Sequence, residues 1–253
     1  MSTVHILSSL VAAGLILSGC DNSNNIAGIN TATGTAPTAE NVNVAGTNEP
    51  VVETQSYKIS VKNLTLAQPM SPLLVAYHSK EVRLYTIGQP ASLGLEMLAE
   101  SGDNASLLAT LSEKTEVTAS QGGSGVFGPG KMTELTLNGT VSDCISVVSM
   151  LVNTNDAFIA ASCVDVSSLA KGASMTLQLP VYDAGTEKND EEASSIPGPA
   201  GGGEGFNEAR DDRDFVASHG GVVTADDGFI TSALTQTHKW SNPAALLTIE
   251  RTN

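Results

Sequence analysis

The sequence predicts an all-β protein in which residues 54–253 form an antiparallel β-sandwich with one or two short helices. About eight short segments either alternate apolar and polar residues or form brief apolar runs, and turn residues separate them. The composition agrees, because small residues, Thr, Val and Leu dominate, while only 15% of residues are charged and 4% are aromatic.

The clearest strand is expected at 57–66, where apolar and polar residues alternate with a period of two. Shorter segments predict further strands at 73–77, 82–88, 134–141, 145–152, 157–163, 174–182 and 244–251. Leucines and a methionine interspersed with glutamates predict a short helix over 91–99, and a helical turn is expected at 106–111. Gly-rich and acidic segments predict long loops at 121–130 and 187–205.

Two of the three cysteines are placed to face each other. The N-T-N-D segment at 153–156 predicts a turn that joins the strands on either side into a hairpin. In a hairpin centred near 153–154, the numbers of facing residues sum to about 307, as those of Cys144 and Cys163 do. The sequence therefore predicts a Cys144–Cys163 disulfide, which an oxidising compartment permits. The alternative is two separate buried thiols.

The first 20 residues predict export and lipid anchoring. Residues 4–17 form an almost uncharged apolar run, shorter than the roughly 20 residues that cross a bilayer but typical of a signal peptide. The run ends in L-S-G-C, which resembles the bacterial lipoprotein box, so residues 1–19 are expected to be cleaved and Cys20 to be lipidated. One departure is that His5, and no Lys or Arg, precedes the box. The alternative is a small buried helix.

Residues 20–53 are expected to be the lipidated cysteine and a disordered tether. The segment is rich in Asn, Thr, Ala and Gly, and it has no aromatic residue with which to offset the entropy of ordering. The expected location is the bacterial cell envelope, on the inner or the outer membrane, facing the periplasm or the surface. Asp21 resembles an enterobacterial signal for retention at the inner membrane, a rule that varies among bacteria.

The charge balance excludes one class of partner. Lys and Arg number 12 against 27 Asp and Glu, which gives a net charge of -15. Nucleic-acid binding needs a basic footprint, so it is not expected. An acidic balance fits an exported protein that meets divalent cations, and it equally fits plain solubility.

Three carboxylates lie in turns at predicted strand ends. Asp156 closes N-T-N-D, while Asp183 and Glu187 begin and end D-A-G-T-E. Oxygen-rich turns on a rigid β-scaffold are typical of a calcium site, because Ca²⁺ takes several oxygen ligands. The alternative is that these residues only bond their own backbone in turns.

The sequence carries no G-x-S-x-G, H-E-x-x-H or phosphate-loop motif. Three histidines lie outside the predicted signal peptide, at His78, His219 and His238. An envelope hydrolase that uses a transition metal would need His78 and His219 to meet beside an acid. The commoner explanation is isolated histidines at the surface or in the core.

Six segments, taken in chain order, carry a resemblance to a known family. They are N-L-T-L-A-Q-P-M-S-P at 63–72, H-S at 78–79, I-G-Q-P-A at 87–91, S-M-L-V-N-T-N-D-A-F at 149–158, Y-D-A-G-T-E at 182–187 and W-S-N-P-A-A-L-L-T-I-E-R at 240–251. Together they resemble the spondin domain, the N-terminal module of F-spondin and mindin, which also occurs in bacterial proteins. The resemblance spans nearly all of 54–253.

The resemblance implies a β-sandwich similar to a C2 domain, and a secreted adhesion module with bound calcium. The family's calcium carboxylates fall on Asp156, Asp183 and Glu187 in this sequence. The third is a departure, because the animal proteins have Asp where this chain has Glu, which is one methylene longer. Calcium tolerates variable ligand geometry, so Ca²⁺ is the expected cofactor.

Two functions follow as hypotheses. The first is a binding or adhesion module with no enzymatic activity, anchored in the envelope through the lipid on Cys20, with a structural calcium site and an unknown protein or glycan as partner. The alternative is a metal-dependent envelope hydrolase of unknown substrate.

Overall fold

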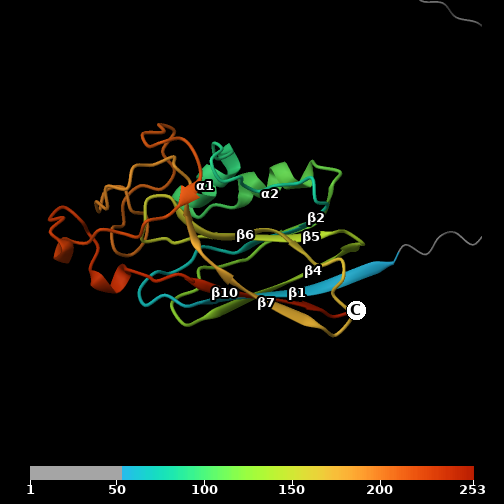
Figure 1. Ribbon diagram of the computed structural model, residues 1–253. Helices are drawn as coiled ribbons and strands as arrows, with labels where there is room; N and C mark the ends of the chain where they lie inside the picture. The colour runs from blue at the N-terminus through green and yellow to red at the C-terminus, as the bar shows by residue number, and fades with distance from the viewer. Residues whose placement is uncertain (1–52) are drawn as a thin grey trace, which may run out of the picture. The chain divides into compact units, whose positions relative to one another are not determined.

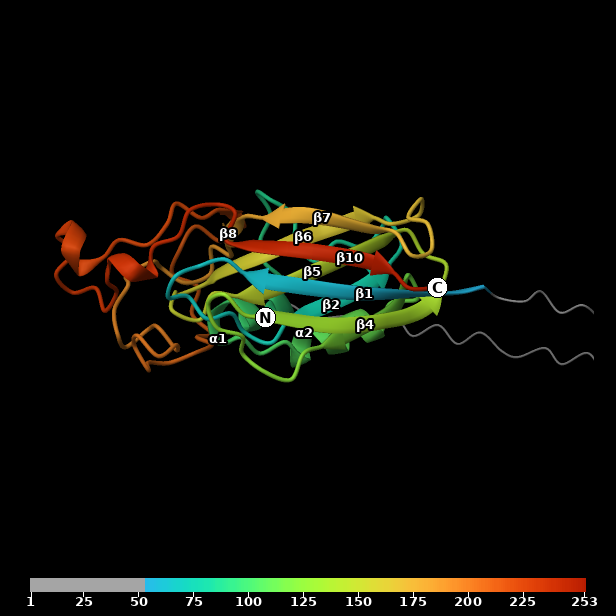
Figure 2. The same ribbon diagram turned by 90° about the horizontal axis from the view of Figure 1, so that it is seen from below.

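The computed structural model describes residues 53–253, and it consists of two antiparallel β-sheets packed face to face (Figure 1). The four-stranded sheet, seen in front in Figure 2, contains in spatial order β4 (Met132–Thr140), β1 (Thr54–Asn63), β10 (Ala245–Arg251) and β7 (Ser174–Leu179). The six-stranded sheet contains in spatial order β3 (Val117–Gly122), β2 (Leu74–His78), β5 (Cys144–Met150), β6 (Ala157–Asp165), β8 (Val181–Asp183) and β9 (Ala217–Ser218). The expected antiparallel sandwich is confirmed.

The core between the sheets follows from the period of two along each strand. Tyr57, Ile59 and Val61 of β1 all point inward and are fully buried. Tyr57 packs edge-on against Tyr77 of β2, with ring centroids 5.2 Å apart. Both tyrosine hydroxyls donate to Oε1 of Gln55 at 2.8 Å, so the polar ends of these buried rings are satisfied.

Two short helices cover the outer face of the six-stranded sheet (Figure 1). They are α1 (Leu93–Ser101) and α2 (Ala105–Ser112), and they pack on Leu74, Ala76 and Phe158. The inner strand β2 is therefore buried on both faces, which explains why residues 74–77 are apolar without alternation. No helix within residues 53–253 has the length and apolar character needed to cross a membrane.

Three predicted elements differ from the structure. Residues 82–88 form bends and turns instead of a strand. The predicted loop at 121–130 begins inside β3, whose half-buried pattern gives no alternation to detect. The single strand predicted at 174–182 is divided at Pro180 into β7 and β8, which belong to different sheets. Proline has no N–H to give to a strand ladder, so the chain crosses between the sheets there.

The Cys144–Cys163 disulfide is confirmed, with the Cα atoms 4.6 Å apart. The predicted register is wrong at this end of the hairpin, because Cys144 pairs with Asp165 rather than with Cys163. A bulge lies between this pair and the pair of Val147 with Ala161, and Cys163 takes a positive φ of 54° next to it. The bulge turns the Cys163 side chain toward Cys144. Summing the numbers of facing residues assumes a regular hairpin, so it cannot predict such a bulge.

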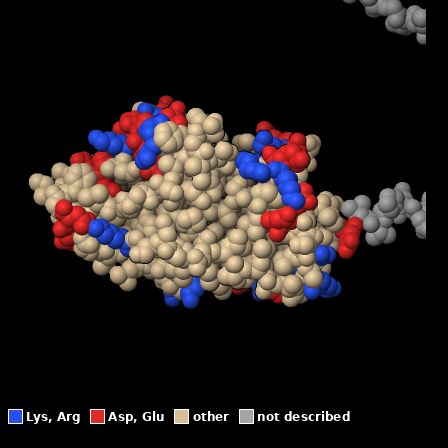
Figure 3. Space-filling model, in the orientation of Figure 1, with Lys and Arg blue, Asp and Glu red and all other residues tan. Residues whose placement is uncertain are grey.

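Residues 184–244, here called the loop lobe, extend from one end of the sandwich (orange to red in Figure 1). Their regular structure is limited to β9 and two 3₁₀ turns, Ala225–Asp227 and Gln236–His238. Ile196, Val222 and Leu234 form a small apolar cluster inside the lobe. In Figure 3 the charged side chains gather toward the ends of the molecule, and the middle of that face carries few.

The predicted signal peptide, the lipidation site Cys20 and residues 20–52 of the predicted tether lie outside the described residues. The structure does not test these assignments, and they stay predictions.

The disulfide closes a loop between residues 19 apart in the sequence. Replacing Cys144 and Cys163 together by Ala is expected to lower the free energy of unfolding by about 3 kcal/mol, because the unfolded chain gains loop entropy. Urea unfolding followed by circular dichroism measures this. Dithiothreitol should weaken the wild type and leave the double variant unchanged. An equal response of both proteins to dithiothreitol would contradict the prediction.

Candidate metal centre

The N-T-N-D turn between β5 and β6 is buried, although it is entirely polar. Thr154 Oγ1 accepts a hydrogen bond from the N–H of Ala157 at 3.1 Å and so closes the turn. Asn153 donates to the carbonyl of Ala67 at 3.0 Å and accepts from the N–H of Ala200 at 2.9 Å. Buried polar side chains must be paired, and here the partners come from loops far away in the sequence. The turn therefore fixes the loops around it.

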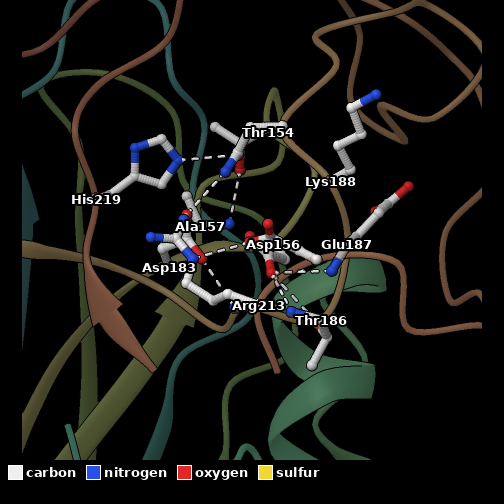
Figure 4. Close-up of polar contacts among 12 residues, drawn as sticks. Thr154, Asp156, Ala157, Asp183, Thr186, Glu187, Lys188, Arg213 and His219 are labelled. Carbon is white, nitrogen blue, oxygen red and sulfur yellow. Dashed lines mark hydrogen bonds and ion pairs between the residues drawn. The ribbon is translucent and has the colours of Figure 1, made fainter. Parts of the chain in front are cut away.

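Asp156, the last residue of this turn, is fully buried and is held by the segment that follows β8 (Figure 4). Its Oδ2 accepts hydrogen bonds from the main-chain N–H groups of Thr186 at 2.8 Å and Glu187 at 3.2 Å. Its Oδ1 has no hydrogen-bond partner among residues 53–253. One carboxylate oxygen is thus satisfied by the backbone, and the other is buried without a partner.

The same segment depends on Gly185, whose φ is 71°. A Cβ atom at this position would lie 2.3 Å from the carbonyl oxygen of Phe215, so only glycine allows this approach. The N–H of Gly185 donates to Oδ1 of Asp183 at 2.8 Å, and its carbonyl accepts from Asp214 at 2.8 Å. Gly185 brings the chain around 213–215 against the end of β8.

Asp183 is buried at the end of β8, but both of its oxygens have partners. Besides the bond from Gly185, its Oδ2 accepts from Arg213 Nη2 and from Asn189 Nδ2, each at 2.8 Å. Arg213 also pairs with Asp212 at its partly exposed end. The charged segment E-A-R-D-D-R-D at 208–214 carries no local signal that Arg213 returns to Asp183.

Glu187 is 5% exposed, and its Oε2 has no partner in the described part of the chain. Its carboxylate points away from Asp156 in Figure 4. Burial, followed by the charge of Glu100, raises the pKa of Glu187 to about 8. Burial, followed by the charge of Asp183, raises the pKa of Asp156 to about 7.

The structure therefore brings the three predicted carboxylates to one end of the sandwich, as parts of a single hydrogen-bonded unit. Across residues 53–253, no three His, Cys, Asp or Glu side chains stand as a ready-made metal cage. The donor set nevertheless suits a hard cation, because two of the three carboxylates bury an oxygen that nothing within 53–253 satisfies. A cation there would need Glu187 to turn toward Asp156.

The structure does not bring His78 and His219 together. His78, at the end of β2 beside Cys144, shares a 2.7 Å hydrogen bond with Ser146 and is fully buried. His219 lies at the other end of the sheet, where its N–H donates to the carbonyl of Val181. The two rings have no hydrogen-bond partner in common among the described residues, and His238 belongs to a 3₁₀ turn. The convergence that a hydrolase would require is not observed in residues 53–253.

A comparison with protein families decides the affiliation of this fold. The family model Spondin_N matches residues 61–196, more than half of the chain. The chain belongs to the spondin N-terminal domain family. The matched part of this spondin domain includes Asp156, Asp183, Glu187 and both bridged cysteines, and it ends before Arg213. No curated protein gives a significant match to the chain. The family consists of non-enzymatic binding modules, so membership indicates an extracellular binding or adhesion module.

The buried carboxyls predict an unusual pH dependence. In metal-free protein the free energy of unfolding is expected to fall as the pH rises from about 4 to about 8, because the folded state keeps protons on Asp156 and Glu187 that the unfolded chain releases. Asp156→Asn is expected to raise stability at pH 8 by on the order of a few kcal/mol and to flatten the slope. Urea unfolding across this pH range, with chelator present, measures both effects.

Asp165→Asn is the matched control. Hydrogen bonds from Ser167, and next from Lys80, lower the pKa of the exposed Asp165 to about 2. Its contribution to stability is therefore lost only as the pH falls toward 2, and the slope between pH 5 and pH 8 should not change. An unchanged slope in Asp156→Asn would show that this carboxyl does not hold its proton in the folded state.

Proposed function

We propose that this spondin domain is an envelope-anchored binding or adhesion module whose loop lobe is held to the sandwich by a structural calcium ion. The observation that carries the proposal is a pair of buried carboxylates, Asp156 and Glu187, each with an oxygen that no other group in residues 53–253 satisfies. Both lie inside the segment that the family model matches.

Electrostatics favour a cation at this place. An isolated carboxylate buried in protein is costly, so it either takes up a proton or gains a positive partner. Among the three predicted carboxylates, Asp183 has such a partner, because Arg213 contacts its Oδ2. Asp156 and Glu187 form no ion pair with a basic side chain in the described structure. In acid, bound protons neutralise the Asp156 and Glu187 carboxylates. As the pH rises and these protons are lost, a divalent cation could neutralise the carboxylates instead.

Calcium is the cation that best suits these residues. Asp156, Asp183 and Glu187 offer only hard oxygen donors, which Ca²⁺ prefers and accepts in irregular geometry. When bound, the ion would supply positive charge and no reaction chemistry. Asp183 bonds through one oxygen to Arg213 and Asn189 and through the other to Gly185, and carboxylate oxygens have further lone pairs with which to bind.

The surface agrees with a binding role for an exported domain. The net charge of the whole chain is -15, which disfavours nucleic acid and leaves a protein or a glycan as the expected partner. The loop lobe presents turns rather than strands at one end of a rigid sandwich, an arrangement in which loops commonly carry recognition. Calcium would fix the lobe without taking part in contact with the partner.

Calcium is expected to raise the melting temperature of the domain at pH 7.5. Ligand that binds only the folded state adds about 2.7 kcal/mol of stability at a concentration one hundred times its dissociation constant. Differential scanning calorimetry of residues 54–253 with chelator, and then with increasing CaCl₂, measures the rise. Asp156→Asn and Asp183→Asn should each reduce it strongly.

Asp165→Asn again provides the control, because this exposed carboxylate belongs to β6 but lies at the opposite end of the strand from Asp156. It should keep the full response to calcium. A response of equal size in Asp183→Asn and in the wild type would refute a calcium site at these residues.

Anchoring through Cys20 follows from the lipoprotein-like L-S-G-C segment. Cells that express the full chain and are fed an alkyne-bearing palmitate should label the protein, which should sediment with membranes. Cys20→Ser is expected to abolish the label and the sedimentation, while the Cys144 and Cys163 double variant keeps both. Equal membrane association of Cys20→Ser and wild type would exclude a lipid anchor at this residue.

A further inference from the structure

Glu100 is a buried carboxylate that the family motif does not include. It lies in the last turn of α1 and is 1% exposed. Its Oε2 accepts a hydrogen bond from the main-chain N–H of Asn207 at 2.9 Å. Its Oε1 is buried, and no donor within residues 53–253 reaches it. The sequence predicted a short helix over 91–99, just before this glutamate, and gave Glu100 no role.

Glu100 lies near the carboxylates of the candidate metal centre. The Thr186 hydroxyl lies 3.4 Å from Oδ2 of Asp156, and the same side chain also contacts Glu100. The helix beneath Thr186 and Glu187 in Figure 4 is α1. Among charged neighbours, Glu100 has the largest effect on Glu187, and it also acts on Asp156. Glu100, Asp156 and Glu187 are therefore close enough to act on one another electrostatically, with Thr186 next to both Glu100 and Asp156.

Nothing on α1 compensates the charge of Glu100. The C-terminal end of a helix carries partial negative charge, and the last turn of α1 has no basic residue. The guanidinium of Arg210 acts on Glu100 only at a distance, because it is paired with other carboxylates. It binds the Glu96 carboxylate through Nε at 2.9 Å and Asp214 through Nη1 at 2.6 Å. Glu100 is thus buried at the helix end that disfavours negative charge, and one of its oxygens is unsatisfied.

We propose that Glu100 is a fourth carboxylate ligand of the calcium site, so that one ion joins α1 to the β5–β6 turn and to the segment after β8. The assignment rests on the calcium site proposed above. It adds a ligand from a third element, in a part of the chain that lies 56 residues before Asp156. It also explains why a helix on the outer face of the sheet ends in a buried glutamate.

Glu100→Gln tests the ligand role with little change of shape, because the amide oxygen can still accept the bond from Asn207. The variant is expected to weaken Ca²⁺ binding at least tenfold in isothermal titration calorimetry at pH 7.5, since a neutral amide replaces a charged ligand. In chelator the same variant should melt at a higher temperature than the wild type, because a buried charge has been removed.

Glu191→Gln is the matched control. Glu191 is also a glutamate, is 2% exposed and has an Oε2 without a partner in the described part of the chain. It differs in its surroundings, because its Oε1 accepts from Val223 and its charged neighbour is Asp190. Its affinity for Ca²⁺ should stay within about twofold of the wild type, as expected for a carboxylate outside the coordination shell.

Europium luminescence distinguishes a ligand from a nearby charge. The lifetime of bound Eu³⁺ in H₂O and D₂O counts the water molecules on the ion. Glu100→Ala should add about one water relative to the wild type, because a missing protein ligand is replaced by solvent. Glu191→Ala should add none.

The outcomes separate the two proposals. If the wild type binds neither Ca²⁺ nor Eu³⁺, the calcium site fails, and the role of Glu100 fails with it. If the wild type binds and Asp156→Asn does not, while Glu100→Gln keeps wild-type affinity and Glu100→Ala adds no water, the calcium site stands and Glu100 is not a ligand. Loss of affinity in Glu100→Gln with an added water in Glu100→Ala supports both.

Discussion

The structure depends on the requirement that buried polar groups be paired. The turn at 153–156 has no apolar side chain and is nevertheless buried, so each of its side chains must find a partner. Asn153 reaches the chain on both sides, at Ala67 and Ala200, and Asn155 donates to Asp190 and Ser195. The β5–β6 hairpin, which is regular, thereby positions loops that have little regular structure. The hairpin in turn is rigid because it lies at the centre of the six-stranded sheet.

Asp156 is where this arrangement leaves an imbalance. Backbone donors satisfy one of its oxygens, and the other has no partner within residues 53–253. Nearby carboxylates add uncompensated negative charge to this unsatisfied hydrogen-bond acceptor. Either a proton or a divalent cation could neutralise Asp156. Among the predicted carboxylates, Asp183 is neutralised by its ion pair with Arg213. The proposed calcium site and the pH dependence of the metal-free domain are therefore two consequences of one uncompensated cluster.

The sequence was sufficient for the sandwich, both helices and the positions of the predicted carboxylates, because period-two alternation and turn residues are local signals. It was not sufficient where contacts between distant segments determine the local structure. The bulge at Cys163 shifts the register by its own geometry, and β3 has no alternation of its own because both its faces are half-buried. Arg213 contacts Asp183, and Glu100 becomes buried, only through tertiary packing. A signal for Glu100 was present, since Glu96 and Glu100 are spaced to share one helix face as like charges.

The loop lobe has a consequence for how the domain comes apart. Its 61 residues contain a two-residue strand, two 3₁₀ turns and a small apolar cluster, so few of its amides belong to a strand ladder. Segments with few ladder bonds and little buried apolar surface open locally, at lower free energy than the core. Hydrogen exchange in 184–244 should therefore proceed while β1, β5 and β10 remain protected. The domain thus joins a rigid sandwich to a tip that opens more easily, and the group that neutralises Asp156 is expected to affect how often the tip opens.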